Sequence, residues 1–297
     1  MASQTTFTLV NKQNGNLAFK LFSFEDNSYF DHLQRNNYYS LIWITRGNGK
    51  LKTDFSEYDL EQNSLFAFSP YQPFVFLSNN IHGIAIYFHS DFFCIHKHQT
   101  EVTCNGVLFN NIYQPPFILV DEKLQTTFEA LVEQIKTEMQ DPGLAQYELL
   151  ISYMKIFLIA ASRLKTAQQP QTLQPMQGGN QPFILQNLKD TIEKDFKTKH
   201  TASDYASTLN ISPNALARIT KNHFNKTLTS LISERIIIEA KRDLYLTNKA
   251  IKEVAYELGY DDEFYFSRFF KKNTGISPQV YRETVGFGKA EVQTTLQ

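Results

Sequence analysis

Val254-Ala255-Tyr256-Glu257-Leu258-Gly259-Tyr260-Asp261, followed by Asp262-Glu263-Phe264-Tyr265-Phe266, repeats a pattern found earlier in the chain. The earlier copy is Tyr205-Ala206-Ser207-Thr208-Leu209-Asn210-Ile211-Ser212, followed by Pro213-Asn214-Ala215-Leu216-Ala217-Arg218-Ile219. In each copy a small residue, Ala206 or Ala255, lets two helices cross closely. Asn210 and Gly259 stand where the chain would leave the first helix in a left-handed conformation, which Asn and Gly tolerate. The pattern predicts two successive helix-turn-helix motifs.

The second helix of each motif has a capping residue and a polar outer face. We expect Ser212 and Asp261 to be the N-caps, with one extra residue in the second turn, and Pro213 suits a first helical position. The outward side chains are Asn214, Arg218 and Lys221 in the first motif, and Glu263, Ser267, Arg268 and Lys271 in the second. This arrangement is typical of a recognition helix that enters the major groove of DNA.

The segment between the two motifs predicts their spacing. Residues Leu228–Leu246 have the apolar periodicity of one long helix. A helix of this length is roughly 28 Å long, which is close to the ~34 Å between successive major-groove faces. We therefore expect one polypeptide to read two adjacent turns of the duplex.

The same region carries a longer signature. It consists of Ala250-Ile251-Lys252-Glu253-Val254-Ala255, Gly259-Tyr260, Tyr265-Phe266-Ser267-Arg268-Phe269-Phe270-Lys271-Lys272 and Gly275-Ile276-Ser277-Pro278-Gln279-Val280-Tyr281-Arg282. This signature resembles the C-terminal region of the AraC family of bacterial transcription regulators, over about 100 residues. Tyr260 and Thr220 stand where the family usually has Phe, Phe264 replaces a small polar residue, and Asn225 replaces a Gly.

The outward residues are candidate DNA contacts with different chemistry. Arg218 and Arg268 could each bind guanine bidentately, contact phosphate, or form a salt bridge within the domain. Asn214 suits adenine, Glu263 could accept from cytosine or oppose the helix dipole, and Lys residues suit phosphates. The full set of predicted contacts is Asn214, Ala217, Arg218, Lys221, Glu263, Phe264, Ser267, Arg268, Lys271 and Lys272. Ala217 and Phe264 could touch a thymine methyl group, although Phe264 could simply pack.

Length and charge indicate two domains in the 297 residues. Residues 183–284 hold 16 Lys and Arg against 13 Asp and Glu, a formal charge of +3. The whole chain has a formal charge of −1, so the remaining residues carry −4. A mildly basic module beside an acidic one favours specific DNA binding over charge-driven coating. The predicted divisions are 1–165, a Gln/Pro/Gly-rich linker at 166–182, the DNA-binding domain at 183–285 and a flexible tail at 286–297.

The N-terminal half has the pattern of a small antiparallel barrel or sandwich. Short strand candidates are Leu17–Phe24, Tyr38–Thr45, Lys50–Phe55, Leu65–Phe68, Phe74–Leu77, Ile81–Phe88 and Phe117–Val120. Gly47-Asn48-Gly49 predicts a hairpin, and Met1–Asn16 predicts a polar arm with little structure. With Phe66-Ala67-Phe68-Ser69-Pro70, the pattern resembles the cupin-like effector barrel of many family members. The expected fold class is therefore α+β, with an all-α C-terminal domain.

Two amphipathic helices follow the strands, over 121–140 and 144–165. They can cover the barrel, or their exposed part can pair with a second subunit, as this region does in the family. We expect a homodimer through 121–165. Phe183–His200 is expected to form the first helix of the DNA-binding domain, with Phe183 facing inward.

Two groups of residues in the N-terminal half are ambiguous. Tyr39, Trp43, Phe66 and Phe68 could line an effector pocket, but core packing is the better interpretation of any single one. His89, Cys94, His96, His98 and Cys104 are all zinc-ligand types, but their spacing fits no standard zinc motif. A solvent-facing loop with a packed Cys94 is the simpler interpretation. We expect no catalytic residues, no metal and no cofactor.

The sequence thus predicts a DNA-binding transcription regulator, more readily an activator, rather than an enzyme. The expected partners are double-stranded DNA, a small-molecule effector, a second copy of the chain, and RNA polymerase. Two alternatives remain, a metal-dependent cupin enzyme with a DNA-targeting module and a DNA binder without an effector. Two cysteines without a secretory signal predict a cytoplasmic, nucleoid-associated protein. The sequence identifies neither the effector nor the operator.

Overall fold

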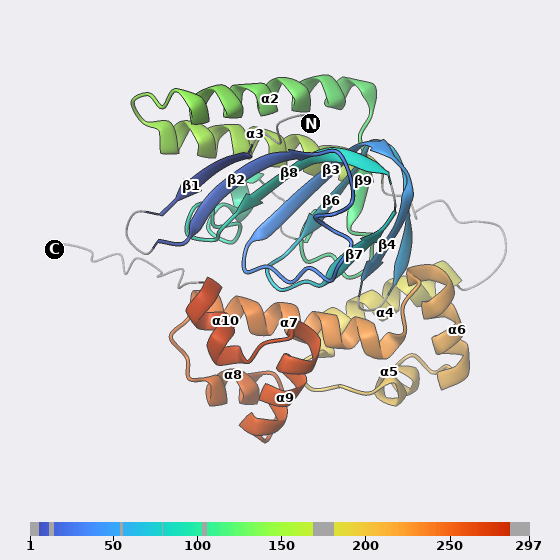
Figure 1. Ribbon diagram of the computed structural model, residues 1–297. Helices are drawn as coiled ribbons and strands as arrows, with labels where there is room; N and C mark the ends of the chain where they lie inside the picture. Colours follow the sequence, from blue (N-terminus) through green and yellow to red (C-terminus); the bar gives the residue numbers. More distant parts are fainter. Residues whose placement is uncertain are drawn as a thin grey trace. The chain divides into compact units, whose positions relative to one another are not determined.

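The chain forms two compact units, Met1–Pro170 and Gln171–Gln297, each with its own core (Figure 1). The computed structural model describes residues 6–11, 15–53, 56–78, 80–102, 106–168 and 181–285. The first unit contains antiparallel sheets and two long helices, and the second contains helices. The expected α+β class is confirmed. Most of the predicted linker, at 169–180, and the predicted tail at 286–297 lie outside the described residues.

Two antiparallel sheets make up the N-terminal unit, instead of the single closed barrel that was one of the expectations. The larger sheet has the strand order β1-β2-β8-β3-β6-β9, and the smaller has β5-β4-β7. The strands are β1 (Thr6–Val10), β2 (Leu17–Phe24), β3 (Tyr39–Gly47), β4 (Gly49–Thr53), β5 (Glu57–Leu60), β6 (Ser64–Phe68), β7 (Phe74–Leu77), β8 (Ile81–Phe88) and β9 (Phe117–Leu119). This two-sheet sandwich is compatible with a cupin-like jelly roll.

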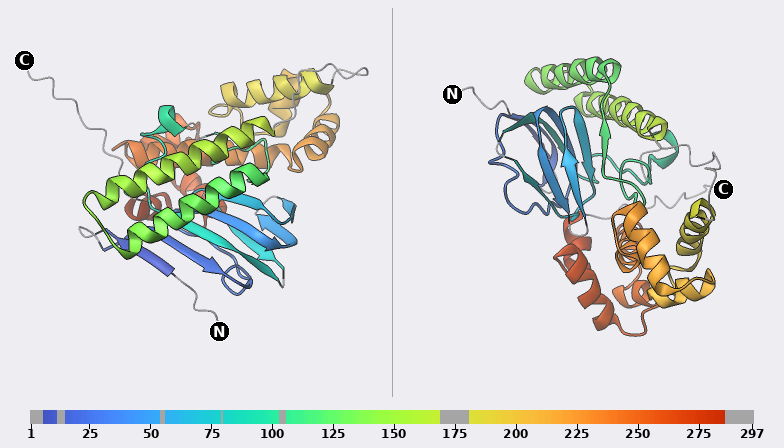
Figure 2. Two further views of the ribbon diagram at one scale, coloured as in Figure 1. Left: turned by 90° about the horizontal axis from the view of Figure 1, so that it is seen from above. Right: turned by 90° about the vertical axis from the view of Figure 1, so that its right-hand side faces the viewer.

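Both faces of the larger sheet are buried, because successive side chains of β3 point into two different hydrophobic cores. Leu41 and Trp43 belong to the core under the helices, whereas Ile42 and Ile44 belong to the core between the sheets. The helices α2 (Glu122–Gln140) and α3 (Gln146–Ala167) lie side by side over the first face (Figure 2). Aromatic rings from both sheets, Phe68 and Phe74 among them at 3.9 Å between centroids, fill the second.

The glycine-flanked turn after β3 is not a hairpin. Strand β3 pairs with β6 and β8, and β4 pairs with β5 and β7, so Gly47-Asn48-Gly49 carries the chain from one sheet to the other. Gly47 has φ +104°, and a Cβ there would lie 2.0 Å from the Asn80 carbonyl oxygen. Two strands close in sequence and joined by a turn suggest a hairpin, but each finds stronger pairing elsewhere.

Three short elements were not expected. The arm predicted to lack structure contains β1, which pairs with β2 and buries Phe7. Its alternating Thr6-Phe7-Thr8-Leu9 pattern was the signal for a strand. Strand β5 and the one-turn helix α1 (Gln99–Val102) were also missed, because both are short and polar.

Seven helices are described in the C-terminal unit over 181–285. They are α4 (Gln181–Asp195), α5 (Ala202–Thr208), α6 (Pro213–Phe224), α7 (Leu228–Leu246), α8 (Ile251–Glu257), α9 (Glu263–Thr274) and α10 (Pro278–Val285). The long predicted helix is α7, with the predicted bounds. The first helix ends at Asp195 rather than His200, and Phe183 is 69% exposed rather than buried. Phe183 is the third residue of α4.

No helix within the described ranges combines the length and the apolar character that crossing a membrane requires.

Lys165, in the last turn of α3, is a buried cation held by carbonyl groups. Its Nζ donates to the Pro115 oxygen at 2.5 Å and to the Phe117 oxygen at 2.6 Å, at the start of β9. Burial lowers the pKa of Lys165 from 10.5 to about 8. This amine therefore ties α3 to the edge of the larger sheet, and the folded state bears the cost of desolvating its charge.

The Lys165 contribution predicts how the stability of the N-terminal unit depends on pH. Below pH 8 both states hold the proton and the folded state bears the full desolvation cost. Between pH 8 and 10.5 the unfolded state binds more protons, so the free energy of unfolding rises with pH, by about 1–3 kcal/mol. Urea titrations at several pH values, followed by the fluorescence of Trp43, the single tryptophan, measure this free energy of unfolding. Lys165→Met should remove this rise relative to wild type, and an identical slope in both proteins would contradict the assignment.

Candidate nucleic-acid interface

The first helix-turn-helix motif consists of α5, a turn and α6. Thr201 and Asp204 form a capping box at the start of α5, and Asn210 takes the left-handed conformation with φ +52°. Ser212 caps α6 by accepting from the Ala215 N–H at 3.2 Å. Ala206 is buried at the helix crossing, as the small residue predicts.

The second motif, α8, a turn and α9, repeats this geometry with one correction. Gly259 is left-handed with φ +80°, and Ala255 is buried. The N-cap of α9 is Asp262, which accepts from the Phe264 N–H at 2.7 Å, and not Asp261. The extra turn residue therefore precedes the cap, and the alignment of the two recognition helices contains no gap.

The two recognition helices present matching faces. Each has 12 residues, and Arg218 and Arg268 occupy the same sixth position. The exposed members of the predicted contact set are Asn214, Ala217, Arg218, Lys221, Phe264, Arg268, Lys271 and Lys272. Glu263 and Ser267 are half-buried, and Phe264 is 73% exposed, so it does not pack within the unit.

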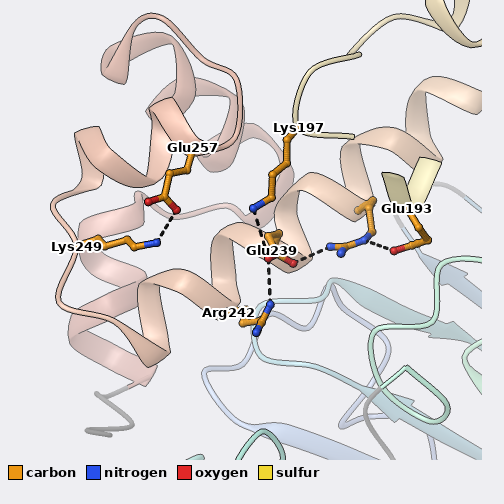
Figure 3. Close-up of polar contacts among 7 residues, drawn as sticks. Glu193, Lys197, Glu239, Arg242, Lys249 and Glu257 are labelled. Atoms are coloured by element: carbon orange, nitrogen blue, oxygen red, sulfur yellow. Dashed lines mark hydrogen bonds and ion pairs between the residues drawn. The ribbon is translucent and has the colours of Figure 1, made fainter. Parts of the chain in front are cut away.

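The charges of the unit divide into structural and free groups. Glu239 of α7, whose side chain is 9% exposed, accepts from Arg235 Nη1 at 3.0 Å and from Arg242 Nη1 at 3.1 Å, and Arg235 Nε reaches Glu193 at 2.8 Å (Figure 3). Burial opposes ionisation of Glu239, but the hydrogen bond and charge of Arg235 lower its pKa overall. Among the described residues, no ion pair engages Arg218 or Arg268. The recognition faces therefore keep cations that are available to a polyanion.

Two contacts of the recognition helices were missed from the sequence. The Arg268 guanidinium lies 5.9 Å from the ring centroid of Tyr265, which is itself 59% exposed. A groove of about 240 Å³ between α4 and α6 is lined by Leu185, Arg218, Ile219, Asn222 and His223. Asn222 occupies the position of Lys272, so the alignment of the two helices could have identified it.

Burial, and then the nearby Lys189 charge, lower the pKa of His223, which lines the same groove.

The four candidate effector residues do not share one face of the sheet. Tyr39 and Trp43 belong to the core beneath the helices, where the Trp43 ring lies 5.7 Å from that of Phe128. Phe66 and Phe68 belong to the core between the sheets, with stacked rings 6.3 Å apart. One interior pocket cannot be lined by all four, although their role in binding stays a prediction.

The histidines and cysteines of the 89–104 segment do not form a metal site within the described residues. His89 is buried against Asp91, with Nδ1 3.4 Å from the carboxylate, and is therefore not on a solvent-facing loop. His98 pairs with Glu101 and stacks on Phe93, and Cys94 is buried. Cys104 lies outside the described residues. No group of three metal-ligating side chains comes together in the part of the chain that the structure describes.

Known proteins are similar to this chain in sequence. The family described as a helix-turn-helix domain matches residues 205–284. The raffinose operon regulator RafR of Pediococcus pentosaceus is 32% identical over 95 residues, which are 32% of this chain and 34% of that protein. The match therefore spans about a third of that relative's length.

Two relatives match along most of the chain. The uncharacterised regulator YfiF of Bacillus subtilis is 24% identical over 259 residues, 86% of this chain and 80% of its own. The transcriptional activator RhaR of Cronobacter sakazakii is 22% identical over 251 residues, 83% of this chain and 84% of its own. Residues 205–284, with their two helix-turn-helix motifs in the same register, thus form an AraC-type helix-turn-helix domain, and along most of its length the chain is similar to transcription regulators.

Proposed function

We propose that the protein binds a two-part DNA sequence, with α6 reading one box and α9 the other, and so controls transcription of the adjoining genes. The observation that supports this most is the equal register of Arg218 and Arg268 on two exposed helices of one unit. Helix α7, with 19 residues, separates the motifs by roughly one turn of duplex. A single subunit then reads what a simple helix-turn-helix protein reads as a dimer.

The N-terminal unit pairs two subunits through α3. Leu149, Tyr153, Ile156 and Ala160 follow the i, i+4, i+7, i+11 spacing of a coiled-coil seam, in which Tyr153 and Ala160 are partly buried against the core. Ile156 is 49% exposed and Leu149 36%, whereas residues such as Leu150, Met154 and Phe157 of the same helix are buried against the sheet. An exposed apolar edge beside a buried face is the pattern of a helix with a second partner.

The same unit senses a small molecule, and binding changes how the two DNA-binding units are presented. Because the relative RhaR is an activator, we favour activation, which would involve contact with RNA polymerase. This activity places the protein in the cytoplasm, on the nucleoid.

Genome-wide occupancy of the protein on its host's DNA tests the function. We expect a compact set of promoter sites that share two boxes about one helical turn apart. Occupancy without a shared motif, with and without candidate metabolites, would contradict sequence-specific regulation.

Arg218→Ala and Arg268→Ala should each weaken binding to a site from that set. Loss of a bidentate base contact costs about 1–3 kcal/mol, or roughly 5- to 150-fold in Kd, and relaxes the preference at one base pair. Lys271→Ala should instead weaken binding to all sequences and reduce the salt slope by about one. Fluorescence anisotropy with single-base variants of the site measures both effects. Lys123 is exposed on α2, so Lys123→Ala is the control for the loss of one positive charge outside the recognition helices. Unchanged affinity in both arginine variants would rule out the recognition-helix assignment.

Ile156→Glu should dissociate the dimer, because two carboxylates would be buried at the α3 seam. We expect at least a tenfold rise in the dimer dissociation constant, about 1.4 kcal/mol or more, in sedimentation velocity over a range of concentrations. Ile156→Leu keeps the apolar surface and should remain dimeric. If the Glu variant dimerised as tightly as wild type, the subunit contact would lie elsewhere.

A further inference from the structure

The segment Phe196–His200, between α4 and α5, contacts both α7 and the second helix-turn-helix motif; we call it the brace. At one end Phe196 is buried with the Arg235 guanidinium 4.0 Å from its ring centroid. The Lys197 Nζ lies 3.9 Å from Glu239 Oε1 (Figure 3), so the brace side chain joins the ion network of α7. The brace belongs to the first half of the unit in sequence but is fixed to the helix that connects the halves.

The other end of the brace meets the turn of the second motif. A Cβ at Gly259 would lie 2.0 Å from the Lys197 carbonyl oxygen and 3.2 Å from the His200 ring. The rings of His200 and Tyr260 are 4.9 Å apart between centroids. Gly259 therefore serves a close approach between the two halves in addition to its left-handed turn.

Tyr260 extends this contact to the second recognition helix. It is 6% exposed, and its ring lies 5.4 Å from that of Phe266 and 5.3 Å from that of Phe269, both on α9. A displacement of the brace would consequently shift α9, which carries Arg268. At the corresponding turn of the first motif, Asn210 is exposed.

We propose that Lys197, His200 and Gly259 are positioning residues that set the separation and rotation of α9 relative to α6, and so the spacing of the two DNA boxes. Helix α7 sets the distance between the motifs and also packs on both α6 and α9. The brace adds a separate contact at the turn that precedes α9, and this contact restrains the rotation of α9 about the axis of α7. The inference rests on the proposed two-box function.

Selection from a random duplex library with the full-length protein tests the proposal, because it needs no known operator. Wild type should enrich two boxes at one spacing, and lengthening that spacing by two base pairs should lower affinity at least tenfold. His200→Ala, which leaves the turn intact, and Gly259→Ala, which drives a methyl group into the Lys197 carbonyl, should enrich a broader range of spacings. For each variant the loss on lengthening should fall to about threefold or less. Since each protein is compared with itself, a general loss of stability or affinity does not alter this ratio.

Asn210→Ala is the matched control. It also places alanine in a left-handed turn, but at an exposed position, so it should retain the wild-type spacing. A relaxed spacing in His200→Ala, or in Gly259→Ala, but not in Asn210→Ala supports the proposal. One unchanged spacing in all four proteins would overturn the brace and leave the two-box function intact. A wild-type selection without any two-box motif would overturn the proposed function itself.

Discussion

A buried carboxylate organises the C-terminal unit. Glu239 lies in the middle of α7 and would be costly to bury alone, so cations must converge on it. Arg235 and Arg242 come from its own helix and Lys197 from the segment after α4. Arg235 in turn binds Glu193 of α4. Satisfying one carboxylate thus joins α4 and the brace to the connecting helix α7, and the same Lys197 places its carbonyl against Gly259 of the second motif.

The allocation of charge explains why this unit can bind DNA specifically. Several of its cations are paired with carboxylates, such as the buried Lys226 with Glu234 at 2.7 Å and the more exposed Lys249 with Glu257 at 2.5 Å. Arg218 and Arg268 remain outside these pairs on exposed helix faces. A modest net charge is therefore sufficient, because the cations that are free are concentrated on the recognition helices.

The N-terminal unit follows a different constraint, since its larger sheet must be covered on both faces. The smaller sheet covers one face and the α2–α3 pair covers the other. Two-sided burial leaves Trp43 and Ile42, neighbours in sequence, in different cores. It also means that α3 uses one side for the sheet, while Leu149 and Ile156 remain exposed at the edge of that side.

Local signals in the sequence determined the helix-turn-helix motifs. Ser212 caps α6, Asn210 and Gly259 adopt φ above zero, and α7 begins and ends where its apolar periodicity does. These features depend on residues a few positions apart, so the chemistry of each residue is enough to predict them. The α2 and α3 helices and most strands follow from the same kind of pattern.

Only the tertiary structure decided which partners those elements find. The Gly47–Gly49 turn has hairpin chemistry, yet it joins two sheets because β3 pairs with β6 and β8, which are distant in sequence. Asp261 and Asp262 are equally suitable N-caps by residue type, and the structure has Asp262 in that position, with Phe266 and Phe270 of α9 buried. The second role of Gly259, facing the Lys197 carbonyl, could not be read from its neighbours. Sequence periodicity specifies the conformation of a segment and which of its sides is apolar, but strand pairing and close approach between halves depend on contacts that only the folded chain creates.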